Sequence, residues 1–181
     1  MIILITGPDR CGKDSLIRSI RQQFKSIVFH QHHYLPIPNM SKSNQVEYEK
    51  EMNLQYFQMI NFYVENNINL IFNRCHIDSL VYAPIYRNYN NFYVIELENI
   101  LMNLNNVFLV TLIDDCTKII EREDGQSQSK GNIVKIKQEI ENHKKFHQIS
   151  NVKNKIIVDM TSRSLNDGIN MVIEFLNAFK K

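Results

Sequence analysis

The sequence predicts a single α/β domain of three layers, in which helices cover both faces of a central, mostly parallel sheet of five strands. Short apolar runs alternate with longer amphipathic segments along the 181 residues, and this alternation is typical of β-α-β units around a parallel sheet. The hydrophobic content of 44% and the charged content of 22% are those of a globular protein. A chain of this length buries one core without a second domain, so the domain is expected to span residues 1–181.

Five apolar runs predict the strands. Runs rich in Ile, Val and Leu, with no alternating polar positions, are typical of strands that are buried on both faces. The runs are MIILIT at 1–6, SIVFH at 26–30, INLIFN at 68–73, VFLVTLI at 107–113 and KIIVD at 155–159.

The segments between these runs predict the helices. Over residues 45–67 the apolar positions recur at spacings of three and four, which gives one helical stripe. An irregular, aromatic-rich connection is expected after the third strand, and a short helix after the fourth. Further helices are expected at 13–24, 92–104, 133–148 and 165–180.

Charge and cysteine content limit the class of protein. A formal net charge of +2 disfavours a polynucleotide as the principal ligand. Cys11, Cys75 and Cys116 are widely separated and form no C-x-x-C motif, so neither a disulfide framework nor a zinc site is indicated. No apolar run approaches the ~20 residues of a membrane span, and the chain begins directly with its first apolar run. We therefore expect a cytoplasmic protein without a membrane partner.

The segment after the second strand carries histidines and aromatic residues. His30, His32 and His33 are not spaced with carboxylates as a zinc site requires. Their neighbours Phe29 and Tyr34 could face a base, although the core is the usual place of such side chains.

The stretch GPDRCGKDS, residues 7–15, matches the phosphate-binding pattern G-x-x-x-x-G-K-[ST] except that Asp14 replaces the hydroxyl residue. It lies between a predicted strand and a predicted helix, where backbone N–H groups hold a polyphosphate. Gly7 and Gly12 permit the close approach of the backbone, and Lys13 reaches the terminal phosphates. The sequence therefore predicts a site for ATP and Mg²⁺. The candidate nucleotide-binding residues are Gly7, Asp9, Cys11, Gly12, Lys13, Asp14, Ser15 and Arg122.

Two interpretations of Asp14 stay open. Its carboxylate is a hard oxygen ligand that could hold Mg²⁺ directly or through a water. It is also an acid in a first helical turn, which the helix dipole favours. Ser15 supplies a hydroxyl one position later, about 100° around the helix, and both residues are candidate metal ligands. Cys11 is expected to be a small buried filler.

This loop, together with NRCHIDSLVYAPIYR after the third strand, resembles the thymidylate kinase branch of the P-loop nucleoside monophosphate kinases, especially its viral and phage members. In that branch the third strand typically ends in Asp-Arg, followed by a Ser and a Val-Tyr pair. Arg74, Ser79 and Tyr82 fit this pattern, while Asn73 replaces the acid. The resemblance implies the P-loop kinase fold, a nucleotide substrate and a homodimer.

The resemblance also implies roles for single residues. Lys13 would grip the donor phosphates, Arg10 would bridge donor and acceptor phosphates, and Arg74 would hold the acceptor phosphate. Asp9 would lie near the acceptor sugar, and Ser79 and Tyr82 would contact the acceptor. Charge supports the first three roles, because phosphoryl transfer between two anions depends on cations around the moving group. Lys13, Arg10 and Arg74 are therefore the catalytic candidates.

The tract 116–132 lies where these kinases carry a lid that closes over the donor. Its part rich in Gly, Ser and Gln indicates a mobile loop. In the family an arginine in the phosphate loop, here Arg10, accompanies a lid poor in catalytic basic residues. Arg122 has two interpretations, a phosphate contact or an exposed ion pair with Glu121 or Glu123.

The distribution of acids bears on the acceptor. A hydroxyl acceptor normally needs a carboxylate base, whereas a phosphate oxygen is already a nucleophile. Residues 26–46 contain no Asp or Glu, and the third strand ends in Asn73. We therefore expect ATP-dependent transfer to a (deoxy)nucleoside monophosphate such as dTMP or a modified pyrimidine analogue.

Two alternatives remain. The first is phosphorylation of a hydroxyl of a deoxynucleoside or of a hydroxymethylated pyrimidine base, with Asp78 as the base; this reading admits nucleic acid as a partner. The second is a nucleotide-binding protein with weakened catalysis, which Asp14 and Asn73 would mark.

Overall fold

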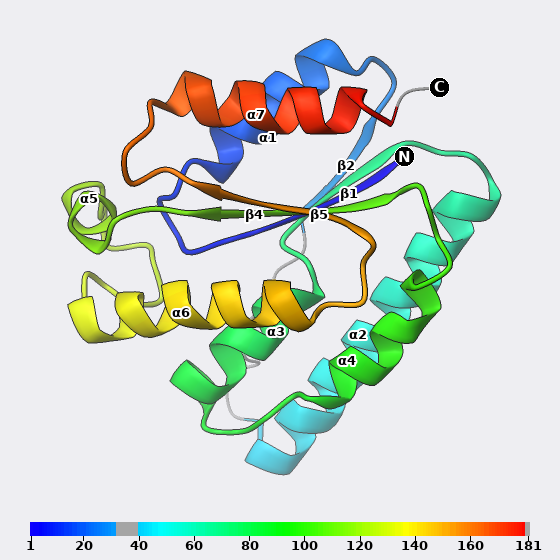
Figure 1. Ribbon diagram of the computed structural model, residues 1–181. Helices are drawn as coiled ribbons and strands as arrows, with labels where there is room; N and C mark the ends of the chain where they lie inside the picture. Colours follow the sequence, from blue (N-terminus) through cyan, green and yellow to red (C-terminus); the bar gives the residue numbers. More distant parts are fainter. Residues whose placement is uncertain (32–39, 180–181) are drawn as a thin grey trace.

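The computed structural model describes residues 1–31 and 40–179. Its centre is a sheet of five parallel strands in the order β2-β3-β1-β4-β5 (Figure 1). This arrangement confirms the predicted three-layer α/β/α class. The strands are β1 Ile2–Thr6, β2 Val28–Gln31, β3 Leu70–Asn73, β4 Val107–Ile113 and β5 Asn154–Asp159.

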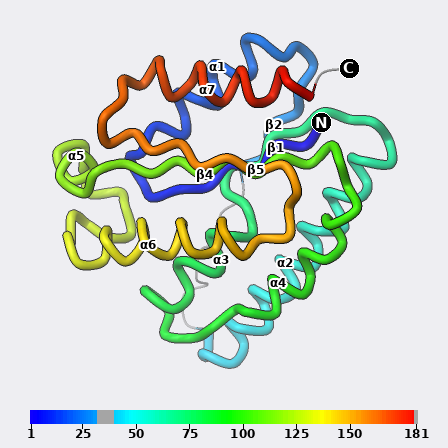
Figure 2. Tube along the Cα trace, viewed as in Figure 1, coloured from blue at the N-terminus to red at the C-terminus, as the bar shows by residue number. Residues whose placement is uncertain are grey.

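Helices cover both faces of the sheet, as Figures 1 and 2 show. Helices α1 and α7 lie on one face, and α2, α3, α4 and α6 lie on the other. The short α5 lies at the carboxyl edge of the strands, on the left of Figure 1. The helices are α1 Lys13–Gln23, α2 Lys42–Glu65, α3 His76–Tyr82, α4 Tyr93–Leu97, α5 Cys116–Glu121, α6 Ile133–Ile149 and α7 Leu165–Asn177. Across residues 1–31 and 40–179, none of the helices combines the length and the apolar character that crossing a bilayer requires.

Strand β1 shows why the core has two halves. Its side chains alternate between the faces, so Ile3 and Ile5 pack with Leu16 of α1, while Ile2 and Leu4 pack with helices of the other layer. All five residues of the strand are buried. An unbroken apolar run was therefore a correct indication of a central strand.

The connection after β3 differs from the expectation. Residues 76–87 form α3 followed by the π-helical turn Ala83–Arg87, so the expected irregular connection was wrong. Every residue of α3 is buried, and a helix that is covered all round shows no amphipathic stripe. The helix expected at 92–104 is also shorter, because α4 ends at Leu97 and a 3-10 helix, Glu98–Leu101, follows.

The strand register brings the candidate site together. Ile5 lies opposite Asn73 on one side and Val110 on the other, and Gln31 also lies opposite Asn73. The phosphate loop therefore leaves the sheet beside the carboxyl ends of β2, β3 and β4. Ligands in open α/β sheets bind at this edge.

Candidate active site

A cavity of about 460 Å³ opens at the carboxyl edge of the sheet. Its size is in the range of small-molecule sites. Most of the predicted nucleotide-binding residues lie on its wall, together with Arg74 of the second motif. Among the described residues, its lining consists of Asp9, Arg10, Gly12, Lys13, Asp14, Ser15, Gln31, Asn73, Arg74, Arg122 and Gln126.

Glycine is required at position 7 of the phosphate loop. The φ angle of Gly7 is 144°, and a Cβ atom there would lie 2.2 Å from the carbonyl oxygen of Leu112 in β4. Gly12, with φ of 98°, adopts the left-handed conformation at the start of α1. These conformations are costly for any residue with a side chain. The loop shape therefore follows from the two glycines of the motif.

Lys13 is held within the loop. Its Nζ donates hydrogen bonds to the carbonyl oxygens of Gly7 at 2.8 Å and Pro8 at 2.6 Å, and the side chain is buried. The Sγ atom of Cys11 lies 3.8 Å from the same nitrogen. Burial raises the pKa of Cys11, so this thiol stays neutral and fills space, as the sequence predicted.

Arg74 lies at the end of β3 and meets the loop. Its guanidinium forms an ion pair with Asp9, and its Nη1 lies 3.5 Å from Oδ1 of Asp78. The ring of Tyr82 lies against the guanidinium, with 4.9 Å between the Arg74 Cζ and the ring centroid. Burial tends to raise the pKa of Asp9, but the charges of Arg74 and Lys13 outweigh it and lower that pKa. Asp9 is therefore ionised at neutral pH.

The lid tract contacts the phosphate loop through two arginines. Arg10 forms an ion pair with Asp124 of the tract 116–132, where a lid was expected. Arg122 donates hydrogen bonds to the carbonyl oxygen of Arg10 at 3.0 Å and to Oδ2 of Asp114 at 2.8 Å. Of the two interpretations of Arg122, the ion pair with Glu121 or Glu123 was wrong, because the guanidinium pairs with the buried Asp114, which follows β4 directly.

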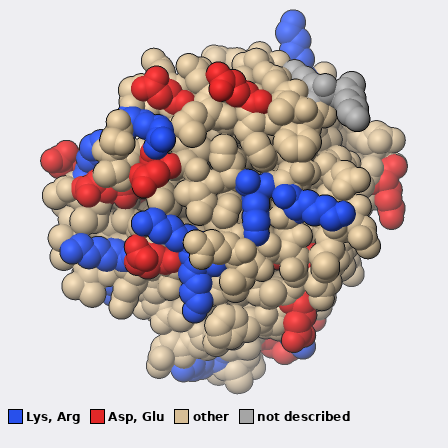
Figure 3. Space-filling view, in the orientation of Figure 1, with Lys and Arg blue, Asp and Glu red and all other residues tan. Residues whose placement is uncertain are grey.

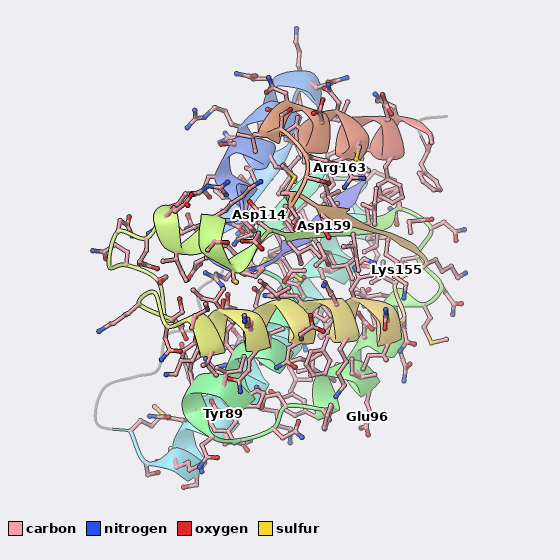
Figure 4. All side chains as sticks on the ribbon, turned by 60° about the vertical axis from the view of Figure 1, so that its left-hand side comes forward. Tyr89, Glu96, Asp114, Lys155, Asp159 and Arg163 are labelled. Atoms are coloured by element: carbon pink, nitrogen blue, oxygen red, sulfur yellow. The ribbon has the colours of Figure 1, made fainter. Side chains whose placement is uncertain are left out.

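Charges of both signs surround this end of the molecule. Figure 3 shows acidic and basic side chains side by side over the part that carries α5. Figure 4 shows Asp114 and Asp159 close together, as expected for residues at the carboxyl ends of the paired strands β4 and β5. Such mixed charge suits a site where ion pairs exchange their partners. It suits the binding of a long polyanion less well.

The polar part of the lid, expected to be mobile, forms a compact turn in this structure. Ser127 donates a hydrogen bond to Glu123, and the Ser127 and Ser129 hydroxyl oxygens lie 3.1 Å apart. Both serines are buried. Gln126, from the same turn, lines the cavity.

Asp78 and Ser79 lie in the protein interior and do not belong to the cavity wall. Asp78 caps α3, because its Oδ2 accepts the backbone N–H of Cys75 at 3.0 Å, and burial raises its pKa. The Ser79 hydroxyl donates to Oε1 of Glu49 at 2.6 Å and accepts from Asn91 at 2.6 Å. Both side chains are thus engaged in bonds that hold the helices together.

Glu139 also lies near the site, and the sequence did not indicate it. It lies on α6, and its carboxylate accepts hydrogen bonds from the hydroxyls of Tyr82, at 3.4 Å, and Tyr86. Burial raises the pKa of Glu139 to about 7. The residue falls within an ordinary amphipathic helix, and nothing in its sequence neighbourhood marks it.

The residues present fit a magnesium ion bound together with nucleotide phosphates. In the part of the chain that the structure describes, no group of three or more His, Cys, Asp or Glu side chains could hold a metal by itself. Asp14 and Ser15, however, line the cavity beside Lys13. Mg²⁺ usually takes one or two protein oxygens plus phosphates and waters, and these two residues supply such oxygens.

His30 contacts side chains of α2 and β3. It lies 2.8 Å from the Tyr63 hydroxyl and stacks on Phe72. Phe29 packs against the core as expected. The other aromatic and histidine residues considered there, His32, His33 and Tyr34, lie outside the described residues.

Sequence comparisons give no relative, since no protein family matches the chain and a search of curated proteins finds no significant match. Solved structures do resemble it. The thymidylate kinase of Candida albicans superposes with a TM-score of 0.68 at 15% identity, covering 98% of this chain and 91% of that one. The deoxyadenosine kinase of M. mycoides, with the products dCMP and dCDP, gives 0.64 at 14% identity, over 99% and 100% of the chains.

A third similar structure is the YorR protein of Bacillus subtilis in complex with phosphorylated GDP. It gives a TM-score of 0.64 at 16% identity, covering 98% of this chain and 96% of that one. At such identities the likeness concerns the fold. With its five parallel strands and its glycine-lysine loop after β1, the chain has the three-layer α/β/α fold of the P-loop kinases.

Proposed function

We propose that the protein transfers the γ-phosphoryl group of ATP to a (deoxy)nucleoside monophosphate. The observation that carries this proposal is the placing of Lys13, Arg10 and Arg74 around one cavity at the carboxyl edge of the sheet. The loop that holds Lys13 suits the donor phosphates, and Arg74, which comes from a different strand, suits an acceptor phosphate. The motifs resemble those of thymidylate kinases of the viral and phage type, so dTMP or a modified pyrimidine analogue is the proposed acceptor.

The two arginines are arranged to exchange partners. Arg10 and Arg74 each form an ion pair with a carboxylate, Asp124 and Asp9. A guanidinium binds carboxylate and phosphate oxygens in the same planar, forked geometry. A phosphate oxygen can therefore replace the carboxylate on each arginine. Cations placed in this way lower the barrier by positioning and by neutralising the moving group.

The carboxylates of the cavity favour a phosphate acceptor. Asp9 and Asp14 are the acids in the described lining, and the lowered pKa of Asp9 makes it a weak base. Asp78 is engaged in capping α3. Residues 26–46 hold no acid at all. A phosphate acceptor avoids the difficulty, because it needs no general base.

When bound, Mg²⁺ would supply charge neutralisation on the donor phosphates. Asp14 and Ser15 would hold it from the first turn of α1. The lid, residues 116–132, would exclude water from the donor, with Arg122 as its phosphate contact. We further propose that the protein acts on free nucleotides in the cytoplasm as a homodimer, which light scattering on the purified protein tests.

The test incubates the purified protein with ATP and Mg²⁺ and with matched panels of nucleoside monophosphates and nucleosides. We expect diphosphate products from one or a few monophosphates. K13A should abolish transfer, whereas the exposed-lysine control K25A should not. Products from nucleosides or from hydroxymethylated bases alone would favour the hydroxyl alternative. Tight binding of ATP with no product from any acceptor would indicate a nucleotide-binding protein without catalysis.

A further inference from the structure

Tyr82, Tyr86 and Glu139 form a tyrosine–glutamate cluster next to Arg74, in which Tyr82 and Glu139 are buried and Tyr86 is half-buried. The two rings stack with centroids 5.7 Å apart and an angle of 26° between their planes. Each hydroxyl donates a hydrogen bond to a different oxygen of the Glu139 carboxylate. One carboxylate therefore holds both rings. The cluster joins three elements: α3, the π-helical turn and α6.

Arg74 rests on this cluster. Its guanidinium lies against the Tyr82 ring, 4.9 Å from the Arg74 Cζ to the ring centroid, and a tilt of that ring would move the platform on which the cation lies. Tyr82 is 3% exposed, so its hydroxyl has no water as an alternative acceptor. Loss of the Glu139 carboxylate would leave a buried donor unsatisfied, and the ring would have to turn to find a new partner.

We propose that Glu139 is a positioning residue for the proposed transfer, holding Tyr82 so that Arg74 faces the acceptor phosphate. This inference rests on the proposed function. It also assigns a task to α6, because this helix follows the lid tract 116–132 directly. A single carboxylate thereby connects the segment after the lid with the acceptor arginine.

The ionisation of Glu139 gives the cluster a signature. The charged and titratable groups that face it are Tyr82 of α3, Tyr86 of the π-helical turn, Asp9 and Lys13 of the phosphate loop, and Arg74 after β3. On α6 itself, Lys135 lies over the Tyr86 ring and His143 lies edge-on to Tyr82. Burial raises the Glu139 pKa to about 7, and the ionised carboxylate accepts from the two hydroxyls more strongly than the protonated acid, whose own O–H needs an acceptor. We therefore expect kcat/KM for the acceptor to rise as the pH increases through about 7.

The test compares E139A and E139Q with E141Q, a control at an exposed glutamate on the same helix that forms an ion pair with Lys144. We expect the KM for the acceptor monophosphate to rise about tenfold or more in E139A, since small misplacements of a positioning group have effects of this order. The KM for ATP should stay close to the wild-type value. E139Q keeps the size and shape of the side chain, so it replaces E139A in the test if that variant does not fold. In E139Q the rise of kcat/KM through pH 7 should disappear. E141Q should retain the wild-type constants and pH profile.

Crystal structures of E139A, or of E139Q where the first does not fold, separate this inference from the proposed function. We expect the Arg74 guanidinium to leave the Tyr82 ring in the variant and to stay on it in E141Q. An unmoved Arg74 together with an unchanged acceptor KM and pH profile would overturn the inference. A wild-type protein that phosphorylates no monophosphate would overturn the proposed function, and the position of Arg74 in the variants would still decide whether Glu139 holds it.

Discussion

Arg74, the first residue after β3, forms an ion pair with Asp9 of the phosphate loop, although 65 positions separate the two residues in the chain. The pair joins the loop proposed to bind the donor to the strand end proposed to bind the acceptor. It arises because β1 and β3 are adjacent and parallel, so both strands deliver their next residues to the same edge.

Removing the charge of Arg74 should abolish most of the transfer. R74A is expected to lower kcat/KM about 10²–10³-fold, the usual effect of removing a group that stabilises charge in the transition state. R74K should recover only part of this, because lysine lacks the planar fork. Steady-state assays with the preferred acceptor measure both. The control R18A changes an exposed arginine of α1, and an equal loss there would contradict a specific role for Arg74.

Weakening the ion pair between Arg10 and Asp124 should strengthen the binding of ATP. Asp124 is 53% exposed at its side chain, and exposed ion pairs contribute at most ~1 kcal/mol. D124N keeps an oxygen for the backbone N–H of Gln126, which Asp124 binds at 3.0 Å. We expect the KM for ATP to fall by no more than about fivefold, because phosphate no longer competes with a carboxylate for Arg10. A rise in this KM would mean that the pair holds the lid in its productive place, and E121Q serves as the charge-matched control.

Two glycines of the described loops should differ sharply in their tolerance of alanine. At Gly7 the added Cβ would meet the Leu112 carbonyl at 2.2 Å, whereas at Gly125 in the lid it would meet nothing within 4 Å. G7A should lose nucleotide binding in a calorimetric titration, because the loop cannot keep its shape. G125A carries only the strain of a positive φ, about 1 kcal/mol. It should bind ATP nearly normally, and equal damage in both variants would argue against the steric explanation.

Acid should destabilise the protein through two histidines of α6. His143 lies 3.2 Å from the Thr6 hydroxyl and His147 lies 2.8 Å from that of Thr111. Burial lowers the pKa of both, that of His147 to about 4. A folded-state pKa below the unfolded value of ~6.5 means that the unfolded chain takes up the proton first. This contribution to stability is therefore complete above pH 6.5 and is lost as the pH falls from there to about 4.

Thermal unfolding between pH 7.5 and pH 4.5 checks this expectation. A loss of about 1 kcal/mol corresponds to ~2–4 °C in Tm for a chain of this size. H147Q should flatten the dependence, and an exposed control, E141Q, should not. A pH dependence that is unchanged in H147Q would place the acid-sensitive groups elsewhere.

The predictability of the fold followed burial. All five strands were predictable because each contains or adjoins a short apolar run, and β1 and β4, where the run is longest, are buried throughout. β2 was found although its residues are only partly buried or exposed. Helix α3 was not predictable, since complete burial of His76–Tyr82 removes the polar face that would reveal its period. Periodicity thus identifies an element with one wet face and fails for one that the core surrounds.

The predictability of the site depended on sequence distance. Lys13 and its two glycines form a local motif, because one turn of backbone must fit a phosphate. Asp124 and Glu139 have no such motif, since their neighbours in space come from distant segments. Asp114 could have been predicted from the sequence, because an acid directly after a buried parallel strand lies at the edge of the sheet where ligands bind.

The pairing of Arg10 with Asp124 and of Arg74 with Asp9 has a consequence for ionic strength. Two cations that already hold anions attract few counterions from solution, so a nucleotide that takes their place releases few of them. We therefore expect nucleotide affinity to fall less with added salt than the number of arginines around the cavity would suggest. Nucleotide binding would replace the carboxylates on the two arginines with phosphates. Chloride would compete only weakly with both kinds of anion.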